Sequence, residues 1–169
     1  MIAINNAGWL APWADLLYFC DRKWFTWHGA EAWFRAFEGR IVKGSLDDRD
    51  CVDELGIKNL LLEDDYGYMT EPDRIAHGRN SGYAAIHIAA RRKASRIILI
   101  GYDLGFQEGE PTHWHGGHPV PNKEDTYKIM RERYPSLAAA LAGQVEVINC
   151  TPTTRLVCFP IQTLEEALP

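Results

Sequence analysis

One stretch, residues 80–103, constrains the fold of this 169-residue chain more than any other. It joins a segment with helical spacing of apolar residues, Gly82–Lys93, to a continuous apolar run, Ile97–Ile100. The run is rich in β-branched residues and too short for a buried helix, so it predicts a strand covered on both faces. Asn80 or Ser81 is then the N-cap of the helix, where unpaired backbone N–H groups can bind an anion.

Strand-like and helix-like segments alternate along the rest of the chain. Further strands are predicted at Ile2–Asn5, Leu16–Cys20, Arg40–Lys43, Ile57–Leu62, Val145–Asn149 and Leu156–Phe159. Helices are predicted at Trp24–Phe37 (divided near Gly29), Asn122–Ala142 (split or kinked at Pro135) and Thr163–Leu168, while Glu63–Arg79 looks irregular. The alternation predicts one α/β domain over residues 1–169, with a mainly parallel sheet and helices on both faces.

Polar residues follow three of the predicted strands. They are Asn5 with Asn6, Tyr102 with Asp103, and Asn149. Each alone is typical of a turn, but the carboxyl ends of strands in open α/β sheets border the usual ligand crevice. Together they favour a nucleotide-type site at one edge of the sheet.

Charge and composition narrow the classes of function. A net charge of −5 and a pI near 5.7 argue against a broad nucleic-acid-binding surface, and the basic run Arg91–Lys93 fits a helix end. No apolar run approaches the ~20 residues that span a bilayer, and the N-terminus lacks a secretory signature. The four cysteines form no C-x-x-C pair, so we expect reduced thiols and a cytoplasmic location.

Half of the six histidines lie within a Gly- and Pro-rich segment, Gly105–Pro121. His113, His115 and His118 admit three interpretations: a general acid or base, a transition-metal site, or a polar loop that caps backbone groups. No H-E-x-x-H or paired-cysteine pattern supports zinc. The isolated His87 is predicted to be structural.

Several motifs carry a family resemblance: Asn80-Ser81-Gly82, Arg96–Asp103, His115-Gly116-Gly117-His118, Asn149-Cys150-Thr151-Pro152 and Ile2–Asn6. Together they resemble bacterial CMP-sialic-acid-dependent sialyltransferases with a Rossmann-like fold. With Leu10–Asp15 and Cys20-Asp21, the chain is similar to phage and prophage proteins grouped with the 6-hydroxymethylpterin diphosphokinase-like proteins.

The resemblance implies a Rossmann-like sheet that lacks the usual first strand and Gly-rich phosphate loop. It makes His118 the general base toward an acceptor hydroxyl. The nucleotide-binding candidates from strand ends and resemblance together are Asn5, Asn6, Asn80, Ser81, Gly82, Tyr102, Asp103, Asn149 and Thr151. Gly105 and Phe106 stand where the family places tyrosines that assist the leaving phosphate.

Three functions therefore stand as alternatives. The first is glycosyltransferase-like: metal-independent, inverting transfer from a CMP-sugar-like donor to a hydroxyl, without an obligatory cofactor. The second is a non-catalytic phage accessory protein that binds or sequesters a nucleotide in the host cytoplasm. The third is diphosphate transfer from ATP to a pterin, for which Asp103 is the one well-placed carboxylate. An exposed sheet edge could also pair with a second copy in a homo-oligomer.

Overall fold

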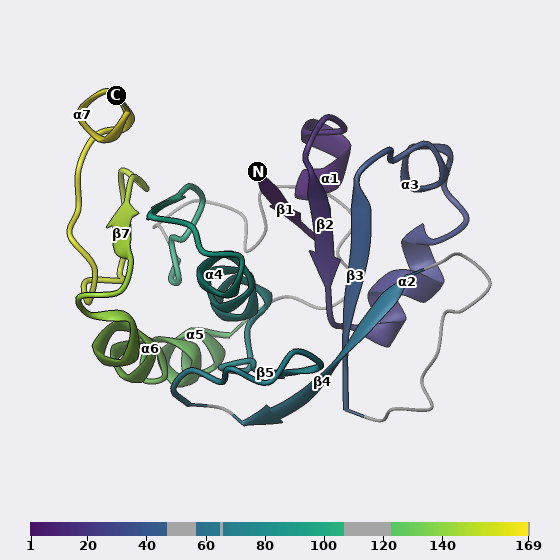
Figure 1. Cartoon of the computed structure of the whole chain (residues 1–169). Helices are drawn as coiled ribbons and strands as arrows, with labels where there is room; N and C mark the ends of the chain where they lie inside the picture. Colours follow the sequence, from purple (N-terminus) through teal and green to yellow (C-terminus); the bar gives the residue numbers. More distant parts are fainter. Residues whose placement is uncertain (47–56, 65, 107–122, 169) are drawn as a thin grey trace.

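The computed structural model describes residues 1–46, 57–64, 66–106 and 123–168, and it has an α/β fold (Figure 1). Parallel strands form a five-stranded sheet in chain order, namely β1 (Ile2–Ile4), β2 (Leu16–Phe19), β3 (Arg40–Ser45), β4 (Lys58–Asp64) and β5 (Arg74–Ala76). A second parallel pair consists of β6 (Arg96–Leu99) and β7 (Glu146–Asn149). The predicted α/β class and parallel strands are confirmed.

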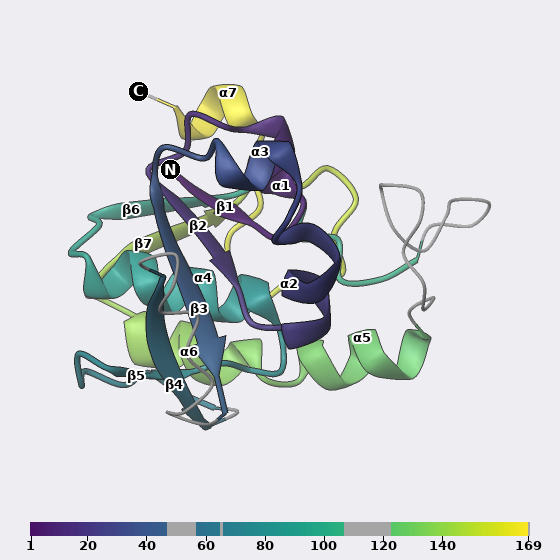
Figure 2. The ribbon, with the colours of Figure 1, turned by 90° about the vertical axis from the view of Figure 1, so that its right-hand side faces the viewer.

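Helices cover both faces of the larger sheet. The helices are α1 (Ala7–Leu10), α2 (Arg22–His28), α3 (Ala32–Arg35), α4 (Ser81–Arg91), α5 (Glu124–Arg131), α6 (Tyr134–Leu141) and α7 (Leu164–Ala167). In Figure 2, α2 and α3 lie in front of the strands and α4 lies behind them. Side chains alternate along β2 accordingly: Leu17 and Phe19 pack with α2 and α3, whereas Leu16 and Tyr18 pack with α4.

The helix α4 is buried on all sides because it lies between the two sheets. Ala84 and Ile88 pack on the five-stranded sheet, while Tyr83 and Ile86 pack with strands β6 and β7 and with α6. Residues 83–88 are all buried. A helix that is apolar all round needs such a position, and α4 accordingly connects the two parts of the core.

Two sequence predictions about strands are wrong. The segment Glu63–Arg79 contains the three-residue strand β5, which pairs with β4 although its own sequence has no apolar alternation. The segment Leu156–Phe159 is not a strand; Leu156 and Phe159 are buried in an irregular segment, and Ile161 forms the isolated bridge to β7. Burial alone produced the strand-like pattern there.

Helix breaks follow the predicted positions. The segment Trp24–Phe37 divides at Gly29, which is the C-cap of α2. Pro135 lies in the first turn of α6, where its missing N–H costs no hydrogen bond. Asn122, the predicted N-cap, lies outside the described residues, and Lys123 occupies the N-cap position of α5. The short helix α1 was not predicted.

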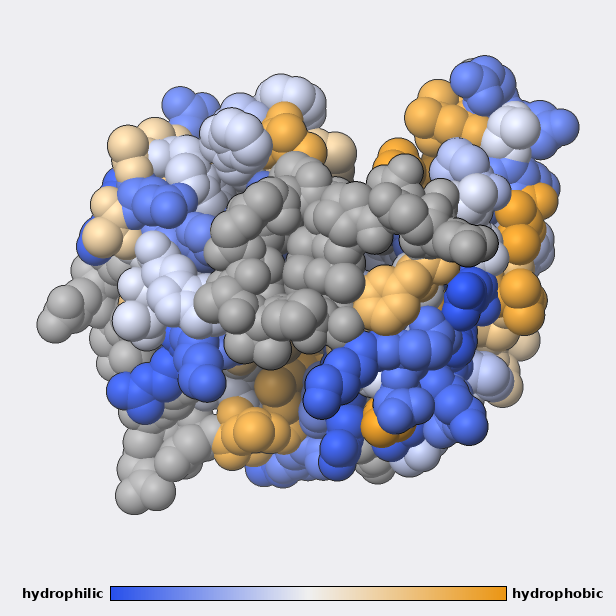
Figure 3. Space-filling model, turned by 180° about the vertical axis from the view of Figure 1, so that it is seen from behind, coloured by the Kyte–Doolittle hydropathy of each residue, from blue (hydrophilic) through white to orange (hydrophobic). Residues whose placement is uncertain are grey.

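The back of the molecule is divided by polarity (Figure 3). Hydrophilic side chains gather over α5, which has no buried residue. Apolar side chains remain exposed along the C-terminal segment, at Val157, Ile161, Leu164 and Leu168. Among the described residues, no helix has the length and apolar character to cross a membrane.

His87 is structural, as predicted. Its side chain is fully buried on α4, and its Nε2 lies 2.7 Å from the carbonyl oxygen and 3.2 Å from the backbone nitrogen of Met69. The ring also contacts the ring of Tyr68, with centroids 4.5 Å apart. Burial lowers the pKa of His87 because desolvation disfavours the imidazolium ion.

This lowered pKa predicts an acid-dependent stability. The unfolded chain binds a proton at His87 from about pH 6.5 downward, whereas the folded chain does so only at lower pH. The stabilisation is therefore complete above about pH 6.5 and is lost as the pH falls through the folded pKa. We expect His87→Gln to flatten the decrease of melting temperature with acidification, and the half-buried control His77→Gln to retain it. Equal pH slopes for the wild type and His87→Gln would contradict this.

Candidate functional site

The first turn of α4 is where the sequence-predicted residues come together. The Oγ of Ser81 lies 3.2 Å from the Sγ of Cys20, which follows β2. On the other side, the hydroxyl of Tyr102, three residues after β6, donates to the carbonyl oxygen of Gly82 at 3.0 Å. The turn therefore joins the carboxyl end of the larger sheet to the segment after β6.

Asn80, rather than Ser81, is the N-cap of α4. Its Oδ1 accepts from the backbone N–H of Tyr83 at 3.1 Å and from the hydroxyl of Tyr134 at 2.7 Å. Its Nδ2 donates to the Sδ of Met130 at 3.2 Å. A ligand would have to compete with these bonds for the Asn80 amide, although its predicted role as a nucleotide contact stays a prediction.

Gly82 is required for close packing. A Cβ at this position would lie 2.7 Å from the Oδ1 of Asn80 and 2.7 Å from the Cε1 of Tyr102. Of the Asn80-Ser81-Gly82 motif, Ser81 thus has the side chain best able to meet a ligand. It is half-buried at the N-terminus of an 11-residue helix, where the helix dipole favours an anion.

Asn5 and Asn6 lie at the same edge, because β1 pairs in parallel with β2. Asn5 has a left-handed backbone (φ 51°), and its buried Oδ1 has no hydrogen-bond partner among the described residues. The Oδ1 of Asn6 accepts from the Nε1 of Trp24 at 2.6 Å. A buried acceptor without a partner is costly, so a ligand donor at Asn5 would remove an existing penalty.

Asn149 and Thr151 are brought close to Tyr102, as predicted, but their polar atoms are engaged within the chain. The backbone N–H of Tyr102 donates to the Oγ1 of Thr151 at 2.9 Å, and the N–H of Thr151 donates to the Oδ1 of Asn149 at 3.1 Å. The Nδ2 of Asn149 donates to the carbonyl oxygen of Leu156 at 3.2 Å. Both side chains are buried, and this network joins the ends of β6 and β7.

The side chain of Asp103 differs from those of Asn149 and Thr151 in its hydrogen bonding. Its backbone carbonyl accepts from the N–H of Arg155 at 2.8 Å, which fixes the main chain. Its half-buried carboxylate has no hydrogen bond or ion pair within the described part of the chain. The Asp103 carboxylate is therefore available to a polar ligand.

His113, His115 and His118 lie outside the described residues, so the base, metal and structural interpretations stay predictions. The residues that flank this segment are linked to each other. One guanidinium, that of Arg155, donates to the carbonyl oxygen of Phe106 at 3.1 Å and to the Oε1 of Glu124 at 2.9 Å. A hydrogen bond from Arg131 and the charge of Arg155 lower the pKa of the Glu124 carboxyl.

The same arginine accounts for Gly105. A Cβ on Gly105 would lie 2.5 Å from the Cδ of Arg155. A tyrosine, which the family resemblance leads one to expect here, does not fit while Arg155 keeps this position. The hydroxyls of Tyr102 and Tyr83 do not replace it freely, because they donate to the carbonyls of Gly82 and Gly67. Burial raises the pKa of Tyr102, so its hydroxyl stays protonated near neutral pH.

Sequence reasoning missed three buried side chains with polar groups that lie beside this edge and beside the half-buried Cys20: Tyr18, Lys43 and Ser45. The Nζ of Lys43 lies 3.5 Å from the Oγ of Ser45, and burial raises the pKa of the Cys20 thiol. The signal was present in the ending Lys43-Gly44-Ser45 of an apolar strand, which is the pattern that singled out Asn149.

Cofactor ligands are not concentrated here. Within the described ranges, no group of three or more His, Cys, Asp or Glu side chains is placed to hold a metal ion. The described cysteines, Cys20, Cys150 and Cys158, are free thiols, as expected from their spacing.

Comparisons of the chain with protein-family models, with curated proteins and with solved structures found no match. The chemistry of the site therefore has to be argued from its own residues.

The capping geometry predicts a structural cost at Asn80. Asn80→Ala removes the cap and leaves the buried Tyr134 hydroxyl without its acceptor, so the free energy of unfolding should fall by about 1–3 kcal/mol. Asn80→Asp keeps an acceptor at the same position and should retain most of the stability. Chemical denaturation measures both variants. Equal stabilities of Asn80→Ala and the wild type would show that the cap contributes nothing.

Proposed function

We propose that the chain binds a nucleotide or a nucleotide-sugar at the carboxyl edge of β1 and β2, against the N-terminus of α4. The single observation that carries this proposal is the juxtaposition of Ser81 with Cys20 at 3.2 Å. It brings the positive end of α4 to the edge where Asn5 has a buried acceptor without a described partner.

The first turn of α4 suits a phosphate. The backbone N–H groups of Tyr83 and Ala84 bind Asn80, and among the described residues those of Ser81 and Gly82 have no acceptor. In the proposal, these two N–H groups and the Ser81 hydroxyl bind the donor phosphate. The parallel strands, with α4 joining β5 of the five-stranded sheet to β6 of the two-stranded sheet, also support a Rossmann-like assignment.

Two nearby side chains complete the proposed contacts. The Asn5 amide oxygen would accept a hydrogen bond from a sugar hydroxyl or an exocyclic amine, and the unpaired Asp103 carboxylate would do the same from the other side of the turn. Asn6, Tyr102, Asn149 and Thr151 would then act mainly by holding the edge in shape, since they are already bonded within the chain.

The catalytic form of the proposal is transfer of a sugar to a hydroxyl acceptor. The acceptor oxygen attacks the anomeric carbon, the bond from that carbon to the donor phosphate breaks, and the nucleotide monophosphate leaves with the electron pair. His118 takes the acceptor proton, a role that rests on the resemblance of His115-Gly116-Gly117-His118 to the sialyltransferase segment. No metal is obligatory for these steps.

A second candidate is a non-catalytic nucleotide binder. It is favoured by the glycine at position 105, where Arg155 occupies the space next to the backbone and no hydroxyl is present to assist a leaving phosphate. Diphosphate transfer is favoured less, because the described residues offer no acidic cluster for magnesium.

Binding is tested at Ser81. Ser81→Ala should weaken CMP binding by roughly fivefold to tenfold, since a hydrogen bond contributes on the order of 1 kcal/mol. The matched control is Ser95→Ala, an exposed serine just before β6. Isothermal titration with CMP and CMP-sugars measures both, and melting temperatures verify folding. Equal affinities in the two variants would contradict the placement of the phosphate.

Catalysis is tested at His118. If it is the base, His118→Ala should lower turnover by about 10²–10⁴-fold and leave donor affinity nearly unchanged, because proton removal matters only in the transition state. His113→Ala and His115→Ala serve as matched controls and should cost much less. The measurement is release of nucleotide monophosphate from each candidate donor. Full turnover without His118 would exclude it as the base, and background turnover in the wild type would favour the binder.

A further inference from the structure

A cleft of ≈ 720 Å³ lies at the opposite end of the sheet from the proposed nucleotide site. It is bordered by the amino ends of β2, β3 and β4, the last turn of α4, the end of α3 with the turn after it, and the loop before β5. Neither the sequence motifs nor the proposed function uses these residues.

The lining of the cleft is strongly basic. Among the fifteen lining residues that the structure describes, five are Arg or Lys and none is acidic: Arg35, Arg40, Lys58, Arg91 and Arg92. Within the described part of the chain, four of them form no ion pair: Arg35, Arg40, Lys58 and Arg92. Like charges that converge without a counter-charge repel one another, so an anion in the cleft would relieve this repulsion.

Described carboxylates near the cleft offset part of its positive charge. The pKa of Asp15, which precedes the lining residue Leu16, is lowered mainly by its bond to the N-terminal ammonium of Met1 and to a smaller extent by the charge of Arg92. Glu38 and Glu71 each lie between two lining residues, and the carboxylate of Glu71 accepts from the backbone N–H of Thr70 at 3.1 Å. The five lining cations still outnumber these three carboxylates within the described part of the chain.

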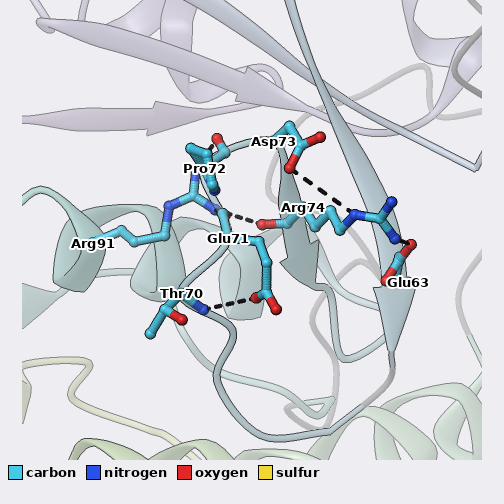
Figure 4. A network of polar contacts seen from close by, with 7 residues as sticks. All are labelled: Glu63, Thr70, Glu71, Pro72, Asp73, Arg74 and Arg91. Atoms are coloured by element: carbon cyan, nitrogen blue, oxygen red, sulfur yellow. Dashed lines mark hydrogen bonds and ion pairs between the residues drawn. The ribbon is translucent and has the colours of Figure 1, made fainter.

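Arg91 shapes one wall of the cleft. Its guanidinium donates to the backbone carbonyls of Glu71 at 2.7 Å, Pro72 at 2.7 Å and Arg74 (Figure 4). A further ion pair joins Arg74 to Glu63 on β4. The loop before β5 is thus fixed to the C-terminus of α4, which leaves the cleft walls preformed.

The position of the cations is not explained by helix dipoles alone. Arg91 and Arg92 lie at the C-terminus of α4, where a dipole favours cations. Arg40 and Lys58, however, begin strands β3 and β4 and belong to no helix. Cations from four separate elements meet in one concavity, which is the arrangement expected of an anion-binding site.

The base of the cleft is apolar. Its lining includes the buried side chains Leu16, Phe34, Val42, Leu60 and Ile88. An apolar base with a cationic border suits a ligand that has both an apolar body and a negatively charged group. A phosphate monoester carries between one and two negative charges near neutral pH and matches the forked geometry of arginine.

We propose that this cleft is a second binding site, which takes a phosphate ester with an apolar or aromatic body. The phosphate lies among Arg40, Lys58 and Arg92, and the apolar body lies on Leu16 and Leu60. The site is independent of the proposed nucleotide site, because it uses the amino ends of the strands rather than the carboxyl ends.

The probe is 1-naphthyl phosphate, titrated into the full chain by isothermal calorimetry. We expect saturable binding that weakens as salt rises, and weaker binding of inorganic phosphate, which lacks the apolar body. The variant Arg40→Gln/Arg92→Gln should bind at least about tenfold more weakly, because it removes two of the cations that would pair with the phosphate.

The matched control is Lys123→Gln/Lys128→Gln. It removes two exposed cations, one just before α5 and one within α5, and neither residue lines the cleft. It should bind like the wild type. If Arg40→Gln/Arg92→Gln does not fold, Arg35→Gln/Lys58→Gln replaces it. Equal affinities in the cleft and control variants, or no saturable binding at about 1 mM probe, would overturn the proposal. Neither outcome bears on the CMP titration of Ser81→Ala, so a failure of this proposal is distinguishable from a failure of the proposed nucleotide site.

Discussion

The capped first turn of α4 is the point on which the two parts of this fold depend. The helix is apolar all round and must be covered on every side, so it can lie only between the two sheets. Its position along its own axis is then set by Asn80, whose Oδ1 binds both the helix backbone and Tyr134 of α6. These polar contacts fix the position of α4 along its axis, which apolar packing alone would leave undefined.

The direction of α4 determines which end of its helix dipole lies at each edge of the sheet. Its N-terminus meets the carboxyl ends of β1 and β2, and its C-terminus meets the amino ends of β2 and β3. The two proposed anion sites consequently use different physical means. At Ser81 the backbone and the helix dipole supply the positive potential, whereas at Arg92 side-chain charge overcomes the negative end of the same dipole.

Local patterns predicted most of the elements that are locally encoded. The helix from Ser81 was predicted from the helical spacing of its apolar residues and from a cap residue. The strand from Arg96 was predicted from a continuous apolar run. The strand β5 could not be found this way, because it depends on pairing with β4 and on the Arg91 contacts with its preceding loop. Conversely, the buried Leu156 resembled a strand residue because burial, not strand pairing, selected an apolar side chain there.

The convergence of the candidate residues was predicted, but their contacts were not. Polar residues at strand ends indicated one shared edge, since parallel strands bring their carboxyl ends together, and whether a ligand binds there stays a prediction. They did not indicate which side chains stay available to a ligand, because that depends on hydrogen-bond partners that are distant in the sequence. Asn149 is engaged by Thr151 and Leu156, while Asp103 stays unpaired within the described residues. The basic cleft could not be predicted from the sequence for the same reason, since its cations come from separate segments of the chain.

Arg155 connects the question of catalysis to the fold. It approaches Gly105 so closely that no side chain fits there, and it links the carbonyl of Phe106 to the carboxylate of Glu124. Glycine at position 105 is thus coupled to an arginine that joins both flanks of the histidine segment. A chain that replaced Gly105 with tyrosine would have to move Arg155 and give up this link. A tyrosine at position 105 and the observed position of Arg155 are therefore alternatives, and with glycine here the leaving phosphate of the proposed reaction would have to be stabilised by the N–H groups of α4 instead.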